Sequence, residues 1–282
     1  MKTVITIAQL RAEVQGWRSE GERIAFVPTM GNLHAGHFRL VQEAKKAADR
    51  VVVSIFVNPT QFGEGEDFGS YPRTIEKDSS GLIEMGADLL FLPAVEEMYP
   101  GGRELVTFIE VPGVSEMLCG ECRPGHFRGV ATVVCKLFNM VGPDLALFGE
   151  KDFQQLAVIR KMVKELNIPI EIQGVPTVRE KNGLALSSRN GYLSVNEREQ
   201  ASLLSRCLSD AKEAILAGKL SIEVIETAQI ERLKEAGFKP EYFSVVRCSD
   251  LKRANSDDME LVILAAAQFG VPRLIDNLSF NR

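Results

Sequence analysis

The sequence predicts an α/β protein with two parts: a Rossmann-like, doubly wound parallel sheet and a second, smaller α+β domain. Two observations lead to this fold class. Strand-like runs alternate with helical patterns over the first 176 residues, as they do in doubly wound proteins. Beyond that point, two helical patterns are followed by three consecutive strand-like runs. The expected domains are therefore residues 1–176 and residues 177–282.

The first domain begins with a strand–helix–strand unit. Residues 23–29 (RIAFVPT) are typical of a short buried strand, and residues 51–57 (VVVSIFV) of a strongly β-branched one. Between them, residues 34–49 carry apolar side chains at helical spacing, which implies parallel strands joined by a right-handed crossover. The alternation continues with helices at 74–85, 127–141 and 152–166 and with strands at 88–92, 145–148 and 170–174.

The second domain combines helices with a separate group of strands. After a turn at Lys181-Asn182-Gly183, helical patterns cover residues 195–216 and 222–237. Strand-like runs then follow at residues 242–247, 261–267 and 273–277. Helices followed by consecutive strands predict a separate α+β unit rather than an extension of the first sheet.

Composition and charge exclude several classes of protein. Hydrophobic residues make up 45% and charged residues 25% of the 282 positions, a balance typical of folded proteins. The net charge of −5 and the lack of a long basic run argue against nucleic-acid binding. No uncharged apolar run reaches about 18 residues, and the first residues do not resemble a signal peptide. We therefore expect no membrane span and a cytoplasmic location.

The five cysteines are scattered along the chain, which favours reduced thiols. Cys119 and Cys122 form a C-x-x-C pair that could bind zinc or cycle as a dithiol. Because no second pair and no nearby histidines complete a zinc set, we expect two loop cysteines without a metal.

The most informative motif is Pro-Thr-Met-Gly-Asn-Leu-His-Ala-Gly-His at residues 28–37, which follows the first strand and opens the first helix. His34 and His37 would share one face of that helix. A helix N-terminus attracts phosphate, and Gly31 and Gly36 would let the backbone approach a ligand. We predict that both imidazoles donate hydrogen bonds to a phosphate. The alternative is a pair of capping or surface histidines. The pattern is similar to the H-x-G-H signature of the nucleotidyltransferase superfamily.

Polar residues follow the second strand of this domain. Asn58 and Gln61 would face the same crevice as the histidines, because the carboxyl ends of parallel strands line the ligand site. Their amides both donate and accept, which suits a substrate with hydroxyl and carboxylate groups. An ordinary Asn-Pro turn is the alternative.

Two further segments could contact phosphate. Lys151 lies directly after the strand at 145–148, Asp152 could cap the next helix, and Gln155 would lie one turn into it. Near the domain boundary, Ser-Ser-Arg at residues 187–189 supplies two hydroxyls and a guanidinium that suit the β- and γ-phosphates of ATP. A mobile loop here could close over the nucleotide. Considered alone, Lys151 could simply be a solvated lysine, and residues 187–189 could simply be part of a polar linker.

Taken together, the ordered segments PTMGNLHAGH, FVNPTQF, YPRT, RPGHFRGV, FGEKDFQQ and VREKNGLALSSRN resemble the pantothenate synthetase family over nearly the whole chain. The resemblance implies an ATP-dependent ligase that joins pantoate to β-alanine through a pantoyl-adenylate, with Mg²⁺ and as a homodimer. It also implies a nucleotide- and pantoate-binding first domain and a C-terminal lid domain.

The resemblance also implies residue roles. His34, His37, Lys151, Ser187, Ser188 and Arg189 would be catalytic. Pantoate would contact Asn58, Gln61 and Gln155, and Gln61 would also meet β-alanine. Asp78 would bind the metal. The ATP site would comprise Met30, Gly31, Asn32, Leu33, His34, Ala35, Gly36, His37, Gly149, Glu150, Lys151, Asp152, Val178, Leu186, Ser187, Ser188 and Arg189.

The chain departs from the family pattern at three of these positions. Asn32 replaces a usual alanine, Leu186 a frequent methionine, and Lys77 a frequent acidic residue before Asp78. Whether His37 transfers a proton or only donates a hydrogen bond stays open.

Three rival functions remain to be separated. They are a nucleotidyltransferase acting on a phosphate, a protein similar to an aminoacyl-tRNA synthetase, and a nucleotide-binding regulator without catalysis. The acidic composition and the intact motifs argue against all but the ligase.

Overall fold

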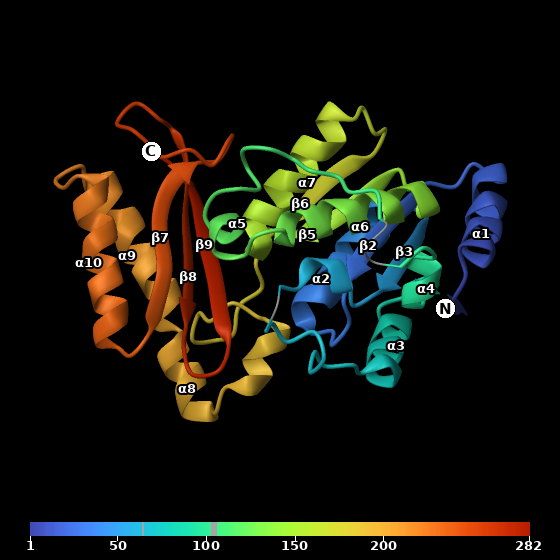
Figure 1. The fold of residues 1–282 in the computed structure, drawn as a ribbon, viewed down its shortest axis with the longest axis horizontal. Coiled ribbons are helices and arrows are strands. Elements are labelled where there is room, and N and C mark those ends of the chain that lie inside the picture. Colours follow the sequence, from blue (N-terminus) through green and yellow to red (C-terminus); the bar gives the residue numbers. More distant parts are fainter. Residues whose placement is uncertain (64, 103–105) are drawn as a thin grey trace. The chain divides into compact units, whose positions relative to one another are not determined.

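The computed structural model describes residues 1–63, 65–102 and 106–282 (Figure 1). The chain forms two compact units. Unit 1 comprises Met1–Glu150 and Val158–Pro176, and unit 2 comprises Lys151–Ala157 and Thr177–Arg282. The main division thus lies between residues 176 and 177, whereas the short segment at 151–157 groups with the C-terminal unit.

Unit 1 contains a six-stranded parallel sheet with helices packed against it. The strands are β1 (Lys2–Val4), β2 (Ile24–Thr29), β3 (Arg50–Ile55), β4 (Leu89–Phe91), β5 (Leu145–Gly149) and β6 (Glu171–Val175). The helices are α1 (Ile7–Ser19), α2 (Ala35–Ala47), α3 (Ile75–Glu84), α4 (Val95–Met98), α5 (Cys119–Cys122), α6 (His126–Val141) and α7 (Phe153–Glu165), whose first turn lies in unit 2. The predicted doubly wound sheet is confirmed.

The strand order β1-β4-β3-β2-β5-β6 locates the ligand crevice of unit 1. From β2 the chain winds outward through β3 and β4, and then returns to add β5 and β6 on the other side of β2. The order therefore reverses between β2 and β5, and ligands of such sheets bind beyond the carboxyl ends of the strands at that point. The histidine loop (residues 30–37) follows β2, and Gly149-Glu150 lie at the carboxyl end of β5.

The central strands of unit 1 are apolar on both faces because helices cover both sides of the sheet. Phe26 on β2 is fully buried and meets the ring of Phe138 on α6 edge-on, with 6.4 Å between the ring centroids. Val51, Val52 and Val53 of β3 are also fully buried, which explains the continuous β-branched run in the sequence.

Unit 2 is an α+β unit with a three-stranded antiparallel sheet in the order β7-β8-β9. The elements are α8 (Val195–Ala201), α9 (Leu203–Ala217), α10 (Ile222–Glu235), β7 (Lys239–Arg247), β8 (Glu260–Gln268) and β9 (Arg273–Asn281). The single helix expected over residues 195–216 is wrong, because it is divided at Ser202. The hydroxyl of that buried serine donates to the carbonyl of Glu199 and competes with the helical pattern.

Some elements of unit 1 were not expected from sequence. The N-terminal pair β1 and α1 was missed, although Thr6 and Gln9 form a capping box that marks the start of α1. Cys119 and Cys122 are the ends of the one-turn helix α5, so the expectation of two loop cysteines is wrong. The described residues contain no cluster of three or more potential metal ligands. No helix in the described ranges has the length and apolar character to cross a membrane.

Candidate active site

The histidine loop, residues 30–37, connects β2 to α2 and has a backbone that few residues tolerate. Gly31 has a φ of +86°, and a Cβ there would lie 3.0 Å from the Cγ2 atom of Ile55. Asn32 follows with a φ of +50°, a left-handed conformation that asparagine adopts more readily than alanine. The departure from the family pattern at Asn32 therefore suits the local backbone.

Asp78 holds this loop from the neighbouring helix α3. Its side chain is only 1% exposed and accepts the backbone N–H groups of Asn32 and Leu33, both at 2.8 Å. The hydroxyl of Thr74 donates to the same carboxylate at 3.0 Å. A carboxylate surrounded by donors is a poor cation ligand, because those donors occupy the oxygens that would bind the metal. The structure thus gives Asp78 an anchoring role in place of the predicted magnesium role.

The two histidines form a reciprocal cap at the start of α2. The N-cap residue His34 accepts the N–H of Gly36 at its Nδ1 atom, at 3.1 Å, and His37 Nδ1 accepts the N–H of His34 at 3.3 Å. Their ring centroids are 4.2 Å apart. An Nδ1 atom that accepts a hydrogen bond carries no proton, so the neutral ring has its proton on Nε2. The capping interpretation and the phosphate-donor interpretation are therefore compatible.

This capping changes how an anion would be recognised. The sequence argument relied on unpaired N–H groups at the start of α2, but the N–H of Gly36 is used by His34 and that of His37 by the His34 carbonyl. The Nε2–H groups of the two rings then become the principal donors that this loop offers to a phosphate.

Gly36 is required for the ring position of His34. A Cβ at residue 36 would lie 2.8 Å from Cε1 and 3.0 Å from Nδ1 of that ring. Such contacts are too close, so any larger residue at position 36 would displace the imidazole.

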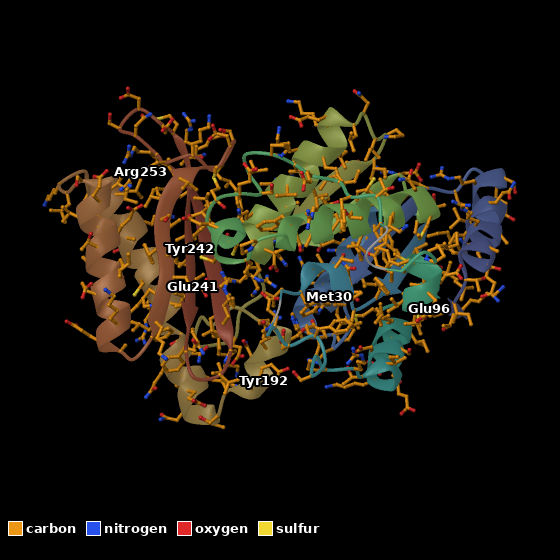
Figure 2. All side chains as sticks on the ribbon, in the orientation of Figure 1. Met30, Glu96, Tyr192, Glu241, Tyr242 and Arg253 are labelled. Atoms are coloured by element: carbon orange, nitrogen blue, oxygen red, sulfur yellow. The ribbon has the colours of Figure 1, made fainter. Side chains whose placement is uncertain are left out.

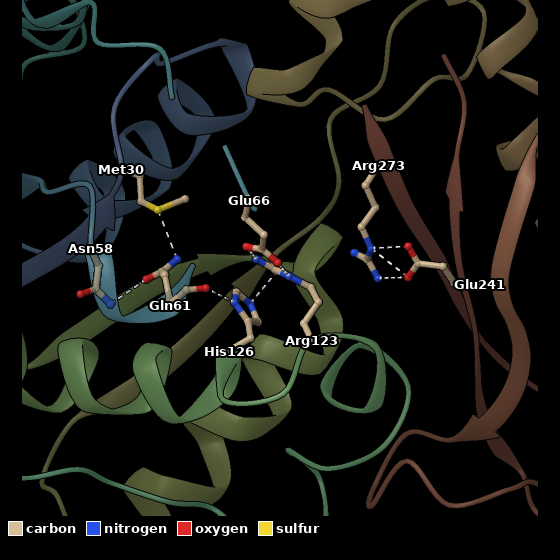
Figure 3. A network of polar contacts seen from close by, with 8 residues as sticks. All are labelled: Met30, Asn58, Gln61, Glu66, Arg123, His126, Glu241 and Arg273. Atoms are coloured by element: carbon tan, nitrogen blue, oxygen red, sulfur yellow. Dashed lines mark hydrogen bonds and ion pairs between the residues drawn. The ribbon is translucent and has the colours of Figure 1, made fainter. Parts of the chain in front are cut away.

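Asn58 caps the 3₁₀ turn Pro59–Gln61 that follows β3, and its side chain is hydrogen-bonded to that of Gln61 at the end of the turn. Gln61 is 8% exposed and its Nε2 atom lies 3.2 Å from the sulfur of Met30, so it faces the histidine loop (Figure 3). Asn58 is 1% exposed, and both ends of its amide are hydrogen-bonded within unit 1. The structure therefore favours Gln61 over Asn58 as a residue that meets substrate.

Residues 123–129 (Arg-Pro-Gly-His-Phe-Arg-Gly) contact Gln61 and help to hold it in place. Their role could not be derived from sequence. The His126 ring is 2.8 Å from the Gln61 carbonyl, and Arg123 is 3.1 Å from the opposite ring nitrogen. Arg123 also forms a bidentate ion pair with Glu66 (Figure 3). Arg128 pairs with Glu110 on the surface. Both arginines thus form ion pairs with glutamates of unit 1.

In unit 2, two predicted phosphate ligands line one hollow. Lys151 and Ser187 are 36 positions apart, yet both border a hollow that also includes Asn190, Leu204 and Asp276. Asn190 is 5% exposed and its Oδ1 atom accepts no hydrogen bond within the described ranges, so a donor from a ligand or water would suit it. Sequence reasoning did not select Asn190.

The remaining predicted residues of unit 2 have simpler positions. Asp152 is exposed and closes the 3₁₀ turn Glu150–Asp152 that precedes α7. The side chain of Gln155 is half-buried, whereas its neighbour Gln154 is buried. The N–H of Leu186 donates to the carbonyl of Val178, so these two residues of the predicted ATP site are paired across one hairpin.

A buried ion pair fixes that hairpin. Arg179 binds both carboxylate oxygens of Asp276, at 2.6 and 2.9 Å, and donates to the carbonyl of Gly183 at 3.0 Å. The adjacent Asn277 donates to the backbone carbonyl of Lys151 at 2.8 Å. Asp276 and Asn277 were missed by the sequence analysis, although an Asp-Asn pair inside a predicted strand was a visible irregularity.

The predicted site residues thus fall into two groups. Unit 1 brings together the histidine loop, Gln61 and the end of β5, and unit 2 brings together Lys151 and the Ser187 loop. Sequence reasoning missed four residues of unit 1 that contact the predicted site residues: Thr74, Tyr99, His126 and Gly129. They belong to no motif with a known role, so no signal in the sequence pointed to them.

Comparison with known proteins gives a consistent result. The family model described as pantoate–β-alanine ligase matches residues 2–279. A pantothenate synthetase from Shewanella loihica is 58% identical over 282 residues, covering all of both chains. The crystal structure of pantothenate synthetase from Thermus thermophilus is 47% identical, with a TM-score of 0.92 over 99% of each chain.

A third relative has been solved with ligands. The pantoate–β-alanine ligase from Francisella tularensis, described as complexed with β,γ-ATP and β-alanine, is 34% identical with a TM-score of 0.80. The match covers 99% of this chain and 97% of that one. Because the family model and these relatives extend over essentially the full length, the chain belongs to the pantoate–β-alanine ligase family.

Proposed function

We propose that this protein condenses pantoate with β-alanine at the expense of ATP. The observation that carries the proposal is the reciprocal cap of His34 and His37, which fixes two Nε2 donors beside the switch point of the parallel sheet. Full-length membership of the ligase family gives this phosphate site its substrates. The relative bound to ATP and β-alanine supports two of the three proposed substrates, namely these two.

The chemistry requires no nucleophile from the protein. A carboxylate oxygen of pantoate attacks the α-phosphorus of ATP, and the bond to pyrophosphate breaks. The amine of β-alanine then attacks the acyl carbon of the adenylate, loses a proton and expels AMP. The protein contributes alignment of the reactants and donors for the phosphate on which charge builds up.

The residues of the two units would divide this work. His34 and His37 would donate to the α-phosphate, and Gln61 and Gln155 would hold pantoate. Lys151 with the segment 186–189 would bind the β- and γ-phosphates, and Val178 would contact the adenine. The shared hollow of Lys151 and Ser187 supports the third assignment.

Magnesium, a homodimer and a cytoplasmic location remain part of the proposal. Bound Mg²⁺ would neutralise charge on the ATP phosphates. Asp78 does not fit as its ligand, because its oxygens accept two N–H groups and one hydroxyl. The magnesium dependence of turnover and the mass of the protein in solution test the first two points.

The deciding experiment is exchange of labelled pyrophosphate into ATP. Exchange that requires pantoate but not β-alanine is the expected result, because only the adenylate-forming half-reaction is reversible without the amine. A nucleotidyltransferase would instead exchange with a phosphorylated acceptor, and a regulator would support no exchange. Absence of pantoate-dependent exchange in folded, ATP-binding protein would overturn the proposal.

A further inference from the structure

The carboxamide of Gln61 is held by a chain of hydrogen bonds that ends at Tyr99, a residue outside every recognised motif (Figure 3 shows the part from Met30 to His126). Tyr99 directly follows α4 and is 3% exposed. Its hydroxyl donates to Asn58 Oδ1 at 2.7 Å, the shortest hydrogen bond that Asn58 makes. Asn58 Nδ2 in turn donates to Gln61 Oε1 at 3.0 Å.

Backbone groups fix the orientation of the Asn58 carboxamide, that is, the positions of its oxygen and its NH₂ group. Its Nδ2 group lies 3.2 Å from the carbonyl of Gly129, which can only accept. Its Oδ1 atom receives the N–H of Thr60, which can only donate, in an Asx turn with a distance of 3.4 Å. Exchanging the two ends of this amide would place donor against donor and acceptor against acceptor, so one orientation is selected.

The orientation of Asn58 then dictates that of Gln61. Since Asn58 presents a donor, Gln61 must turn its oxygen toward it and its NH₂ group away. That NH₂ group lies against the sulfur of Met30, a weak acceptor that a substrate oxygen would readily replace. Gln61 is thereby set to donate to an oxygen of an acidic or hydroxylated ligand.

The main chain of Gln61 is held separately, by α6. The ring of His126 meets its carbonyl, and a Cβ at Gly129 would lie 2.7 Å from its Cα atom. A change at Tyr99 therefore removes the shortest bond to Asn58 and weakens the support of the Gln61 side-chain amide, while leaving these main-chain contacts in place.

We propose that Tyr99 is a positioning residue that acts through Asn58 to keep the NH₂ group of Gln61 directed at pantoate. The inference rests on the proposed function for its substrate. Burial raises the pKa of Tyr99, which keeps the hydroxyl protonated and able to donate well above neutral pH. Thr60 donates to the same oxygen through its N–H at 3.4 Å and its hydroxyl at 3.0 Å, so Tyr99 supplies the shortest of three bonds.

The test is Tyr99→Phe, which removes one hydroxyl and preserves the ring. We expect the KM for pantoate to rise about fivefold, as for loss of one net hydrogen bond, with the KM for ATP unchanged. The matched control is Tyr242→Phe on β7 (labelled in Figure 2), which we expect to keep both KM values. Loss of thermal stability in Tyr99→Phe without a change in the KM for pantoate would overturn the proposal.

A double-mutant cycle separates positioning from general damage. In a Gln61→Ala background the hydroxyl of Tyr99 has no amide to orient, so adding Tyr99→Phe should leave the KM for pantoate nearly unchanged. An equal fivefold effect in both backgrounds would show that Tyr99 acts by another route. Calorimetric titration of pantoate replaces KM if Gln61→Ala turns over too slowly.

A substrate-free readout keeps this inference distinct from the proposed function. In wild-type protein the side-chain NH₂ of Gln61, identified by its loss in Gln61→Ala, should give two separate proton signals by NMR. Tyr99→Phe should shift them or bring them together, whereas Tyr242→Phe should not. Unchanged signals would refute the positioning role even if no pantoate-dependent exchange were found.

Discussion

The histidine loop (residues 30–37) and the serine loop (residues 186–189) are both proposed to bind phosphate, but the fold holds them in different ways. The histidine loop is fixed along its length, because Asp78 accepts two of its N–H groups and its two imidazoles cap each other. The serine loop is secured at its two flanks, where the Arg179–Asp276 ion pair fixes the preceding hairpin and the buried Asn190 donates to Glu180 and to the carbonyl of Ala185.

The way in which each loop is held suits its proposed task. Donors to the α-phosphate must be in place before charge develops, so a loop saturated with internal hydrogen bonds suits them. A segment that closes over the outer phosphates must instead move about a secure base. Ser187 accepts only the local N–H of Arg189 among the hydrogen bonds described for its hydroxyl, which suits such a segment.

The largest effect is expected for Arg179→Met in unit 2. The variant leaves the carboxylate of Asp276, which is 3% exposed, without its ion-pair partner, at a cost of about 3–5 kcal/mol in the free energy of unfolding. The matched control is Arg273→Met, whose partner Glu241 is 30% exposed (Figure 3), so about 1 kcal/mol or less is expected. Calorimetry measures both, and equal losses would contradict the buried-anchor interpretation.

Asp78→Ala should come next, and it acts on unit 1. Two buried N–H groups lose their acceptor, so we expect the free energy of unfolding to fall by about 2–3 kcal/mol. Fluorescence of Trp17, the one tryptophan of the sequence, reports denaturation of this unit.

The control for that variant is Glu76→Ala, an exposed residue in the same turn of α3, which should change stability little. A metal-binding role for Asp78 predicts the reverse pattern. Stability without Mg²⁺ would be unchanged, and the magnesium concentration needed for half-maximal activity would rise.

Gly36→Ala should lower activity with little loss of stability. The new Cβ displaces the ring of His34, and a misplaced donor to the reacting phosphate should lower kcat about tenfold or more. Alanine is otherwise the better helix former, so the unfolding free energy should stay within about 0.5 kcal/mol or rise. Gly16→Ala in α1, where no atom lies within 4 Å of the added Cβ, should leave kcat unchanged. Normal kcat in Gly36→Ala would refute the role of the cap.

The smallest effect concerns pH. Burial alone would raise the pKa of Glu66, but the hydrogen bonds and charge of Arg123 outweigh it, and the pKa lies below the usual 4.5. A pKa lowered by folding adds stability above pH 4.5 that is lost as the pH falls through the folded-state value. Glu66→Gln should therefore flatten this part of the acid-unfolding curve. Glu110→Gln, on an exposed pair with Arg128, should not.

How far the sequence predicted this protein can be judged element by element. The β-branched run of β3 and the apolar spacing of α2 were readable because each follows from a local periodicity. The break at Ser202 was not readable, since a serine inside a helical pattern bends the chain only where its hydroxyl turns back on the helix. The hydrogen bonds of Asp78 were unreadable for a similar reason: a carboxylate in sequence gives no sign of whether cations or N–H groups surround it.

The sequence by itself determined the doubly wound first unit, the helix-then-strand second unit and the strand–turn–helix setting of the histidine motif, because these depend on residues close together in the chain. Tertiary structure alone decided that Asp78 accepts an N–H group of the histidine loop, that Tyr99 donates to Asn58, and that the ring of His126 meets the carbonyl of Gln61. These contacts join residues 41 to 65 positions apart, and hydrogen bonds over such separations leave no periodic or local signal to read.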